Sequence, residues 1–508
     1  RRIAEYVAAN PQCTAVMQAA IGLSIVELVR ESGHWRLVTD SRYNRRVTAH
    51  TRMQMTGPAA EDSLLGGTPG TAATAFGTFG NCASGATPWG TYLTAEENVQ
   101  DYFGNAAAAA FEPRASAFHR RFGLRQRGSA FGWEHTDARF DLRANPNEPF
   151  KFGWIVEIDP LNPADVPRKL TALGRFRHEG ATTVVAPDGR IVVYMGDDQA
   201  FEYFYKFVSR GTWDPGNSTA NRRLLEDGTL YVAKLEADGT GRWLPLLWSP
   251  RGTLSPANGF DSQADVLIDC RGAADLLQAT PLDRPEDVAV DASGRVYLAC
   301  TMNPARGAPP RGAAASRNID TGVDAANPRA ENRGGHILEF REARADATAE
   351  DFAWEVLIVA GAADSAHLVT LSDAPLNTDE VYFAGLTDAT GISGFANPDN
   401  LAVDSFGNLW IVTDGPQPEG NNGCFVCPLD GPLRGMVRQF MAGPVGAEIC
   451  GCAFTDDEST LFLTVQHPGA GGSLSAPIST WPDGDGHAPR PSLVAIEAEA
   501  PGARIGQV

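Results

Sequence analysis

The sequence predicts an all-β fold of the β-propeller class, and an internal repeat is the first observation that supports it. Residues 284–298 and residues 397–411 align without a gap, with Pro, Ala, Val, Asp and Gly in register. The second observation is that each copy has two short apolar runs separated by an Asp/Gly turn, which is the pattern of a β-hairpin. Hairpins repeated along a chain of 508 residues fit a β-propeller, in which four-stranded sheets form blades around a central channel.

Weaker copies of the same unit indicate further hairpins. Residues 179–194 and residues 452–465 each contain two apolar runs around a polar turn, and the segment from Trp35 has the pattern of a second hairpin strand. The spacing between copies is irregular, so long loops must connect them. Residues 14–29 differ from the rest and have the pattern of one amphipathic helix.

Three segments are predicted as insertions in the propeller, near residues 105–135, 304–333 and 469–490. They are rich in small, polar or turn-forming residues, and none has the composition of a linker between domains. The whole chain, residues 1–508, is therefore predicted to form a single domain with these insertions.

Composition and charge exclude several classes of protein. With 43% hydrophobic residues the chain can build a sizeable core, which excludes disorder of the whole chain. No stretch approaches the roughly 18 consecutive apolar residues of a membrane-spanning helix, so no membrane partner is expected. The net charge of -20 argues against nucleic acid as a specific partner and suits the binding of hard cations such as calcium.

Acidic residues recur at one place in the repeated hairpin. Glu179, Glu286 and Asp399 stand at or near the start of the first strand in three copies. Such residues often cap turns, and this would be the preferred interpretation for one of them. In a propeller the strands nearest the axis start at the channel mouth, so three equivalent acidic residues converge there. The pattern therefore favours a metal site.

The stretch from Asn81 to Asn98 contains one thiol, Cys82, followed by the adjacent carboxylates Glu96 and Glu97. Neighbouring side chains on a strand point to opposite sides, so if both glutamates bind metal they must serve different ions or lie where the strand has ended. A thiolate prefers a soft or borderline metal, whereas carboxylates suit calcium, magnesium or ferric iron. The alternative is that Cys82 is a small buried apolar residue.

Other acidic residues at strand ends, and the histidines, give weaker indications of a site. Asp197 and Asp198 are interpreted as turn or surface carboxylates, and each histidine taken alone is more often structural or exposed than a ligand. Acidic residues at two further strand ends, Glu157 and Glu448, are left open between a turn and a site.

The eight cysteines include two local pairs, Cys424 with Cys427 and Cys450 with Cys452. A Cys-x-x-Cys pair can be half of a zinc site or a redox motif, but no matching set with the usual spacing follows. A local disulfide bond within these pairs, or free thiols, is therefore the preferred interpretation.

A series of short motifs runs in order through nearly the whole chain. They are Asp40-Ser-Arg-Tyr-Asn-Arg-Arg, Thr56-Gly-Pro-Ala-Ala, Asn81-Cys to Glu96-Glu97-Asn98, His178-Glu179-Gly-Ala, Arg284-Pro-Glu-Asp, Asn327-Pro-Arg-Ala-Glu-Asn-Arg, Asn397-Pro-Asp-Asn and Gln466-His-Pro-Gly. With these motifs the sequence resembles the PhoX-type alkaline phosphatases. The stretch from the cysteine to the two glutamates is the most specific part of the resemblance.

The resemblance implies a six-bladed β-propeller with a cluster of calcium and ferric iron at its mouth. Carried over onto this sequence, the iron ligands would be Cys82, Glu179, Glu286 and one of Glu96 and Glu97. The calcium ligands would be the other of these two glutamates, Asp399 and Glu157. Arg284 would hold the phosphate, since the guanidinium fork matches two phosphate oxygens.

The function implied by the resemblance is that of an alkaline phosphatase, which releases inorganic phosphate from organic phosphomonoesters. Its substrates would be small phosphorylated molecules. Members of the family resemble exported monomers, so a periplasmic or secreted location is expected, with export by the twin-arginine route. The alternatives are a calcium-dependent lactonase or phosphotriesterase propeller, and a non-catalytic binding propeller. Cys82 separates these possibilities, because a site for calcium alone has no use for a thiolate.

Overall fold

The structure is a computed structural model that describes residues 2–311, 314, 317, 319–372, 375–473, 475–500 and 502–507. The chain forms two compact units. Unit 1 comprises residues 1–198, 204–233 and 243–279, and unit 2 comprises residues 199–203, 234–242 and 280–508. The prediction of a single domain with three insertions stays a prediction.

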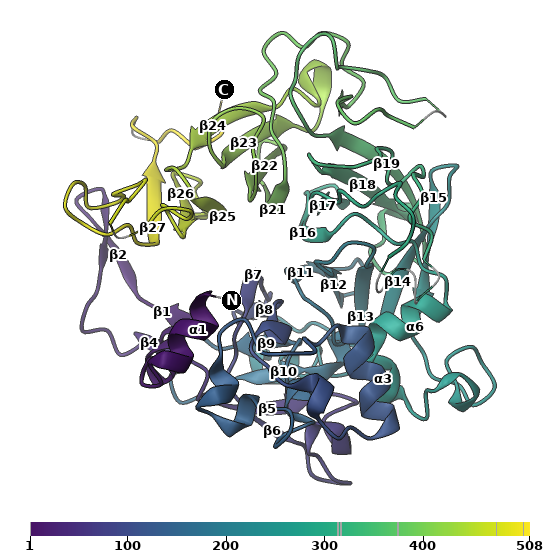
Figure 1. The fold of residues 1–508 in the computed structure, drawn as a ribbon. Coiled ribbons are helices and arrows are strands. Elements are labelled where there is room, and N and C mark those ends of the chain that lie inside the picture. The colour runs from purple at the N-terminus through teal and green to yellow at the C-terminus, as the bar shows by residue number, and fades with distance from the viewer. Residues whose placement is uncertain are drawn as a thin grey trace. The chain divides into compact units, whose positions relative to one another are not determined.

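Unit 1 contains a six-stranded sheet in the order β6-β5-β10-β9-β8-β7 and the antiparallel run of strands β11-β12-β13-β14 (Figure 1). In the six-stranded sheet only β10 and β5 pair in parallel, and the other neighbours are antiparallel. Two short pairs, β1 with β4 and β2 with β3, lie outside these sheets. The strands are β1 (Leu23–Ile25), β2 (Leu28–Glu31), β3 (His34–Leu37), β4 (Arg45–Val47), β5 (Arg52–Thr56), β6 (Thr74–Phe76), β7 (Asn81–Ala86), β8 (Tyr92–Glu96), β9 (Ile155–Ile158), β10 (Arg168–Leu170), β11 (Thr182–Val185), β12 (Arg190–Gly196), β13 (Phe204–Thr212) and β14 (Gly228–Leu235).

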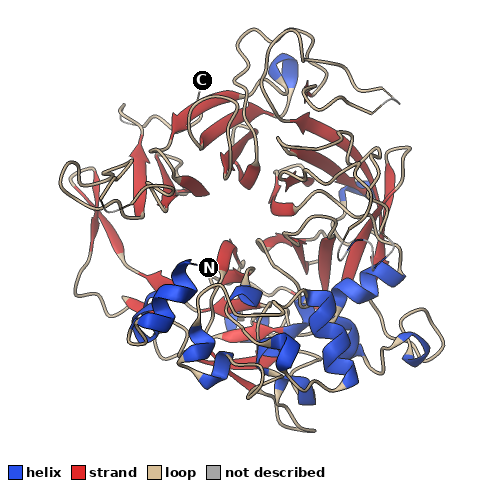
Figure 2. Cartoon of the chain, in the orientation of Figure 1, coloured by secondary structure: helices blue, strands red, loops and turns tan. Residues whose placement is uncertain are grey.

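All the α-helices whose bounds the described residues define belong to unit 1, where they gather beside the strands (Figure 2). They are α1 (Arg2–Ala9), α2 (Cys13–Ala20), α3 (Pro113–Phe122), α4 (Ser218–Asn221), α5 (Gln263–Ile268) and α6 (Cys270–Leu276). None of the described helices is long and apolar enough to cross a membrane.

Unit 2 is built of antiparallel sheets. In the first, β16, β17, β18 and β19 follow one another, and β15 and β20 add to β19. The second has the order β21-β22-β23-β24, and the third the order β25-β26-β27. The strands are β15 (Thr240–Pro245), β16 (Pro285–Val290), β17 (Arg295–Cys300), β18 (His336–Glu342), β19 (Asp351–Val359), β20 (Tyr382–Phe383), β21 (Pro398–Val403), β22 (Asn408–Thr413), β23 (Gly423–Pro428), β24 (Arg438–Ala442), β25 (Glu448–Phe454), β26 (Thr460–Gln466) and β27 (Ser492–Glu497).

The repeat predicted from the sequence is also a repeat of backbone conformation. Residues 284–298 lie in the hairpin β16–β17, and residues 397–411 lie in the hairpin β21–β22. Arg284 and Asn397, which align, both precede their strand with a positive φ, 43° and 55°. Both first strands then have an irregular register after their proline. The weaker copies are confirmed as hairpins too, as β11–β12 and β25–β26.

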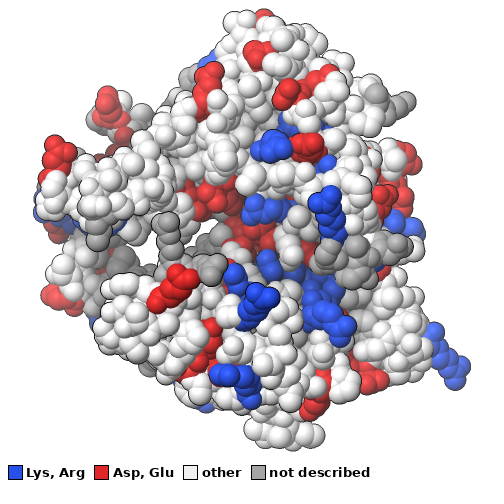
Figure 3. Space-filling view, viewed as in Figure 1, with Lys and Arg blue, Asp and Glu red and all other residues white. Residues whose placement is uncertain are grey.

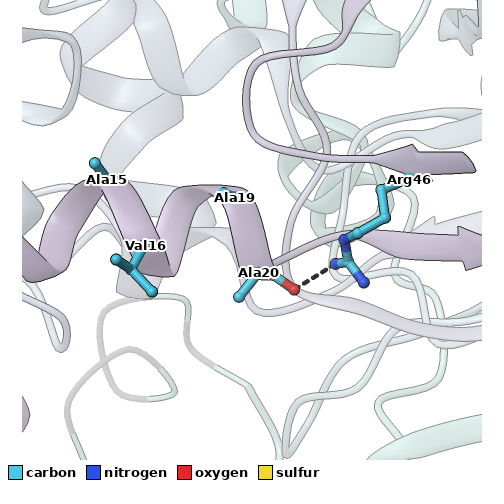
Figure 4. Close-up of a pocket in the computed structure, with 5 residues that line it drawn as sticks. All are labelled: Ala15, Val16, Ala19, Ala20 and Arg46. Carbon is cyan, nitrogen blue, oxygen red and sulfur yellow. Dashed lines mark hydrogen bonds between the residues drawn. The ribbon is translucent and has the colours of Figure 1, made fainter.

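The predicted helix over residues 14–29 is wrong in its second half. The helix α2 ends at Ala20, where Arg46 of β4 donates a hydrogen bond to the carbonyl of the last residue (Figure 4). Gly22 follows with a φ of 94°, and a Cβ at this position would lie 2.1 Å from the carbonyl oxygen of Val47. The chain is therefore held against β4 and continues as β1 and β2. This long-range contact outweighs the local helical pattern.

Two hydrophobic clusters lie on opposite faces of the sheet β21–β24, because alternate strand residues point to opposite sides. We call them cluster A and cluster B. Cluster A includes Leu409, Ile411, Phe425, Cys427 and residues of β17 to β19. Cluster B includes Trp410, Val412, Cys424, Ile449 and residues of β26.

Candidate metal centre

Three side chains of unit 1 converge at one point: Cys82, Glu97 and Glu179. Each offers a ligand atom, and these atoms lie within 4.8 Å of one another. The Cys82 thiol donates a hydrogen bond to Oε1 of Glu179 over 3.0 Å, whereas both glutamates are buried. A metal ion would replace the thiol proton, since a cysteine binds metal as the thiolate. The group therefore has the donor atoms of a mixed thiolate and carboxylate site.

The backbone around β7 brings this group together. Cys82 lies in a β-bulge, where the register of β7 with β8 shifts between Asn81 and Ser84. Bulges re-aim side chains and often occur beside active sites. Farther along β7, a Cβ on Gly85 would lie only 1.8 Å from the carbonyl oxygen of Ala181, so only glycine permits this approach to the segment before β11. The strands β7, β8 and β11 lie side by side in unit 1 (Figure 1).

Glu96 has a different environment from Glu97. Its Oε1 accepts a hydrogen bond from Nζ of Lys169 over 2.6 Å, and both side chains are fully buried. Its Oε2 accepts hydrogen bonds from the backbone N–H groups of Gly153 and Trp154. Burial raises the pKa of Glu96 and lowers the pKa of Lys169 to about 8. The sequence predicts that these neighbouring glutamates point to opposite sides. In the structure Glu96 forms a buried ion pair, whereas Glu97 belongs to the donor group with Cys82 and Glu179.

Glu157 is likewise surrounded by structural partners. Its Oε1 accepts hydrogen bonds from the indole of Trp89 over 2.9 Å and the hydroxyl of Thr91 over 2.6 Å, and its other oxygen pairs with Arg168. The carboxylate is fully buried in unit 1. Among the groups of potential metal ligands in the described part of the chain, none includes Glu157 or Glu96.

Glu286 and Asp399 form a second convergence, within unit 2. They are equivalent residues of the two repeated hairpins, each the second residue of its first strand. Both are buried, and their carboxylate oxygens lie within 4.8 Å of each other. Each lies where its strand has an irregular register, so the same backbone feature places both carboxylates. Two carboxylates this close repel each other unless a cation or a proton lies between them.

Arg284 lies beside this pair. Its Nη2 is 3.2 Å from Oε1 of Glu286, and its side chain is 32% exposed. The left-handed backbone conformation at residue 284 is unfavourable for a residue with a Cβ, which is typical of functional positions. Arg284 thus combines a carboxylate partner with access to solvent.

A third group of potential metal ligands lies in unit 2, and the sequence left only one of its members, Glu448, open as a site residue. Asp414, Glu448 and His467 offer ligand atoms within 4.8 Å of one another. Glu448 is buried, and its carboxylate accepts hydrogen bonds from Gln466 and from the Cys450 thiol. The signal in the sequence was weak, since each residue stands next to a turn. The indications were Glu448, an acidic residue at a strand end, and the motif Gln466-His-Pro-Gly.

The interpretation of Asp197 and Asp198 as turn or surface carboxylates is wrong about their exposure, because both side chains are buried. Asp197 is buried and pairs with Arg271, whose Nε donates to Oδ2 over 2.8 Å. On the face of the molecule in Figure 3, acidic and basic side chains lie interspersed.

Comparisons with known proteins identify the family of this chain. The family model described as alkaline phosphatase PhoX matches residues 4–469. The solved structure of Pseudomonas fluorescens PhoX in complex with vanadate, a transition-state analogue, is 39% identical in sequence and has a TM-score of 0.82, covering 96% of this chain and 81% of that chain. A search of curated protein sequences gives no match.

Other solved structures are much less similar. An aldose sugar dehydrogenase from Streptomyces coelicolor, in its PQQ-bound form, is 10% identical with a TM-score of 0.29 over 82% of this chain and 93% of its own. A gluconolactonase from Xanthomonas campestris is 12% identical with a TM-score of 0.28 over 88% of this chain and 95% of its own. Similarities at this level support no argument about structure or function, so they lend nothing to the lactonase alternative.

The β-sheets and the donor groups define an all-β protein with carboxylate and thiol groups suited to metal binding. The chain belongs to the PhoX family of alkaline phosphatases, since the family model spans most of its length. It is accordingly a phosphoric monoester hydrolase, as the sequence predicts. The likeness to the Pseudomonas fluorescens structure also confirms the predicted fold class, an all-β propeller with helical and loop insertions.

Proposed function

We propose that this alkaline phosphatase hydrolyses small organic phosphomonoesters with the help of bound iron and calcium. The observation that carries the proposal is the group of Cys82, Glu97 and Glu179, a thiol with two buried carboxylates. Carboxylates suit both calcium and ferric iron, whereas the thiolate suits a transition metal. The donor atoms present therefore fit a centre of mixed composition.

The residues divide into ligands and structural partners. Cys82, Glu97 and Glu179 would hold iron, as would Glu286, and Asp399 would hold calcium. Glu97 is favoured over Glu96 because the oxygens of Glu96 already accept hydrogen bonds from Lys169 and two backbone N–H groups. Glu157 is set aside as a calcium ligand for the same reason.

The chemistry divides between the metals and the protein. When bound, such metals supply positive charge that offsets the negative charge of a phosphoryl group during its transfer. Arg284 binds and orients the phosphate through two oxygens, and its partner Glu286 fixes the guanidinium beside it. Cys82 gives up its proton, now shared with Glu179, when it becomes a ligand.

The activity and the metals can be tested together on the purified protein. We expect turnover of p-nitrophenyl phosphate at alkaline pH, and elemental analysis should find iron and calcium. A calcium chelator should abolish turnover, and added calcium should restore it. Full activity in protein free of iron would contradict the proposed centre. Turnover of diesters or lactones, without turnover of any monoester, would contradict the proposed substrate class.

Replacing Arg284 by lysine should weaken substrate binding and turnover, by about 10- to 100-fold in kcat/KM, while the metal content stays unchanged. Lysine keeps the charge but loses the two-pronged geometry that matches phosphate. Steady-state kinetics with p-nitrophenyl phosphate and elemental analysis of the variant measure both. Unchanged kinetics would show that Arg284 does not bind substrate. Loss of metal would show that its role is to hold Glu286.

We also propose a periplasmic or secreted location and a monomeric state for this enzyme, on the basis of its family. Activity in the periplasmic or culture-medium fraction of expressing cells would support the location, and light scattering would measure the mass of the particle. Activity confined to the cytoplasm, or a dimer at micromolar concentration, would contradict these two proposals.

A further inference from the structure

The local cysteine pairs of unit 2 do not face each other in the folded chain. Cys424 and Cys427 are three residues apart on β23 and therefore point to opposite faces of the sheet, into cluster B and cluster A respectively. In β25 an irregular register separates Cys450 from Cys452. The Cys450 thiol donates to Oε1 of Glu448 over 3.0 Å, whereas Cys452 packs against cluster B. Neither local pair is therefore placed to form a disulfide bond.

The two cysteines of cluster B come from different sheets and meet there. Cys424 is fully buried on β23, and Cys452 on β25 is partly exposed. Both cysteines pack in cluster B, where the neighbouring Cys424 thiol and burial raise the pKa of Cys452 well above that of an ordinary thiol. The strands β23 and β25 contact each other directly within unit 2. No local sequence pattern indicates this pair.

We propose that Cys424 and Cys452 form a disulfide bond when the protein meets an oxidising environment. The bond would link the sheet β21–β24 to the sheet β25–β27 through cluster B and would enclose residues 425–451. A cross-link of this kind stabilises a protein mainly by restricting the unfolded chain. The proposal concerns the third sheet of unit 2 and does not depend on the identity of the metals.

Cys452 is expected to react first, because it is more exposed than Cys424. With a small disulfide such as oxidised glutathione as oxidant, the Cys452 thiolate attacks one sulfur, forms a mixed disulfide and releases one reduced glutathione. The Cys424 thiolate then attacks Sγ of Cys452 and releases the second glutathione. In total two protein thiols and one oxidised glutathione give one protein disulfide and two reduced glutathiones. Because the raised pKa leaves little thiolate at neutral pH, the reaction is expected to be slow there and to become faster as the pH rises.

The bond would secure the strand that carries the third donor group. Glu448 is the first residue of β25, four residues before Cys452, and its carboxylate bonds Gln466 at the end of β26. Fixing β25 to β23 restricts the separation of the third sheet from its neighbour. Oxidation should therefore raise the temperature at which the protein loses its structure, whatever the metal content.

The test uses the whole purified protein, oxidised with glutathione disulfide at pH 8.5 or reduced with a phosphine. After alkylation of the free thiols under denaturing conditions, peptide mass mapping should find Cys424 joined to Cys452 in the oxidised sample alone. The melting temperature should rise by about 3–6 °C on oxidation and return on reduction. Cys452→Ala should abolish this rise. Cys427→Ala, on the same strand but in cluster A, should retain it.

Several results would overturn the proposal. One is full alkylation of both Cys424 and Cys452 after oxidation, and another is either residue joined to a different cysteine. A rise in melting temperature that persists in Cys452→Ala would assign the effect to another bond. If a variant fails to fold, the peptide map of the wild-type protein decides alone. Because none of these readouts measures phosphatase activity, they are independent of the proposed metal centre.

Discussion

Replacing Cys82 by serine is expected to lower phosphomonoesterase activity by more than about 100-fold, since changes outside the ligand shell of a metal already cost about 10- to 100-fold. Serine substitutes a poor neutral donor for the thiolate in the group with Glu97 and Glu179. Iron content and visible absorption should fall with activity. Much of the calcium should remain, because carboxylates hold it without a thiolate. Elemental analysis, an absorption spectrum and p-nitrophenyl phosphate kinetics measure these three properties.

The control for this prediction is Cys13→Ser. Cys13 is the first residue of α2 and belongs to no donor group in the described part of the chain. This variant should keep its iron, its spectrum and its activity. If Cys82→Ser also kept all three, Cys82 would have a structural role, and the proposed iron site would be wrong.

Replacing Lys169 by methionine is expected to reduce the free energy of unfolding by about 3–5 kcal/mol, because it leaves a buried carboxylate without its counter-ion. The partner is Glu96, and both side chains are fully buried in unit 1. The ammonium group also donates to the carbonyl of Lys151 and lies 3.9 Å from the ring centroid of Phe152. All these interactions are lost in the variant. Denaturation by urea, followed by circular dichroism, measures the change.

Two further variants make this result specific. Lys151→Met removes a partly exposed ion pair with Glu148 and should cost only about 0–1 kcal/mol. Adding Glu96→Gln to Lys169→Met removes the unpaired charge and should restore part of the lost stability. A cost below about 1 kcal/mol for Lys169→Met would show that Glu96 takes up a proton in the variant at little cost.

The sequence predicts the repeated hairpins well because they depend on local signals. Turn residues and alternating apolar residues within 284–298 and 397–411 are enough to place four strands. The helix predicted over residues 14–29 fails for the opposite reason. Its end depends on Val47, which packs against Gly22 from a distant strand.

In the candidate site, too, local motifs predict some features and contacts between distant residues decide the others. Cys82 and the glutamates at 97 and 179 could be proposed from motifs, but the choice between Glu96 and Glu97 could not. Strand alternation predicts that they point apart, without saying which of the two faces the donor group. The decision comes from Lys169, 73 residues away, which occupies the side of Glu96. Likewise, no pattern in the sequence connects Cys424 with Cys452, because their contact arises only when two sheets pack.

The close approach of β7 to the segment before β11 has a consequence for directed evolution of this enzyme. A Cβ at residue 85 would lie 1.8 Å from the carbonyl oxygen of Ala181, so any substitution there must push the two segments apart. Cys82 lies on the same strand, three residues before Gly85. The same movement would therefore draw its thiol away from Glu179. Most substitutions at residue 85 in a mutant library are therefore expected to give variants with a disrupted ligand set. Variation aimed at new substrates is better placed on the solvent-exposed loops, where the chain can change without altering the spacing of these strands.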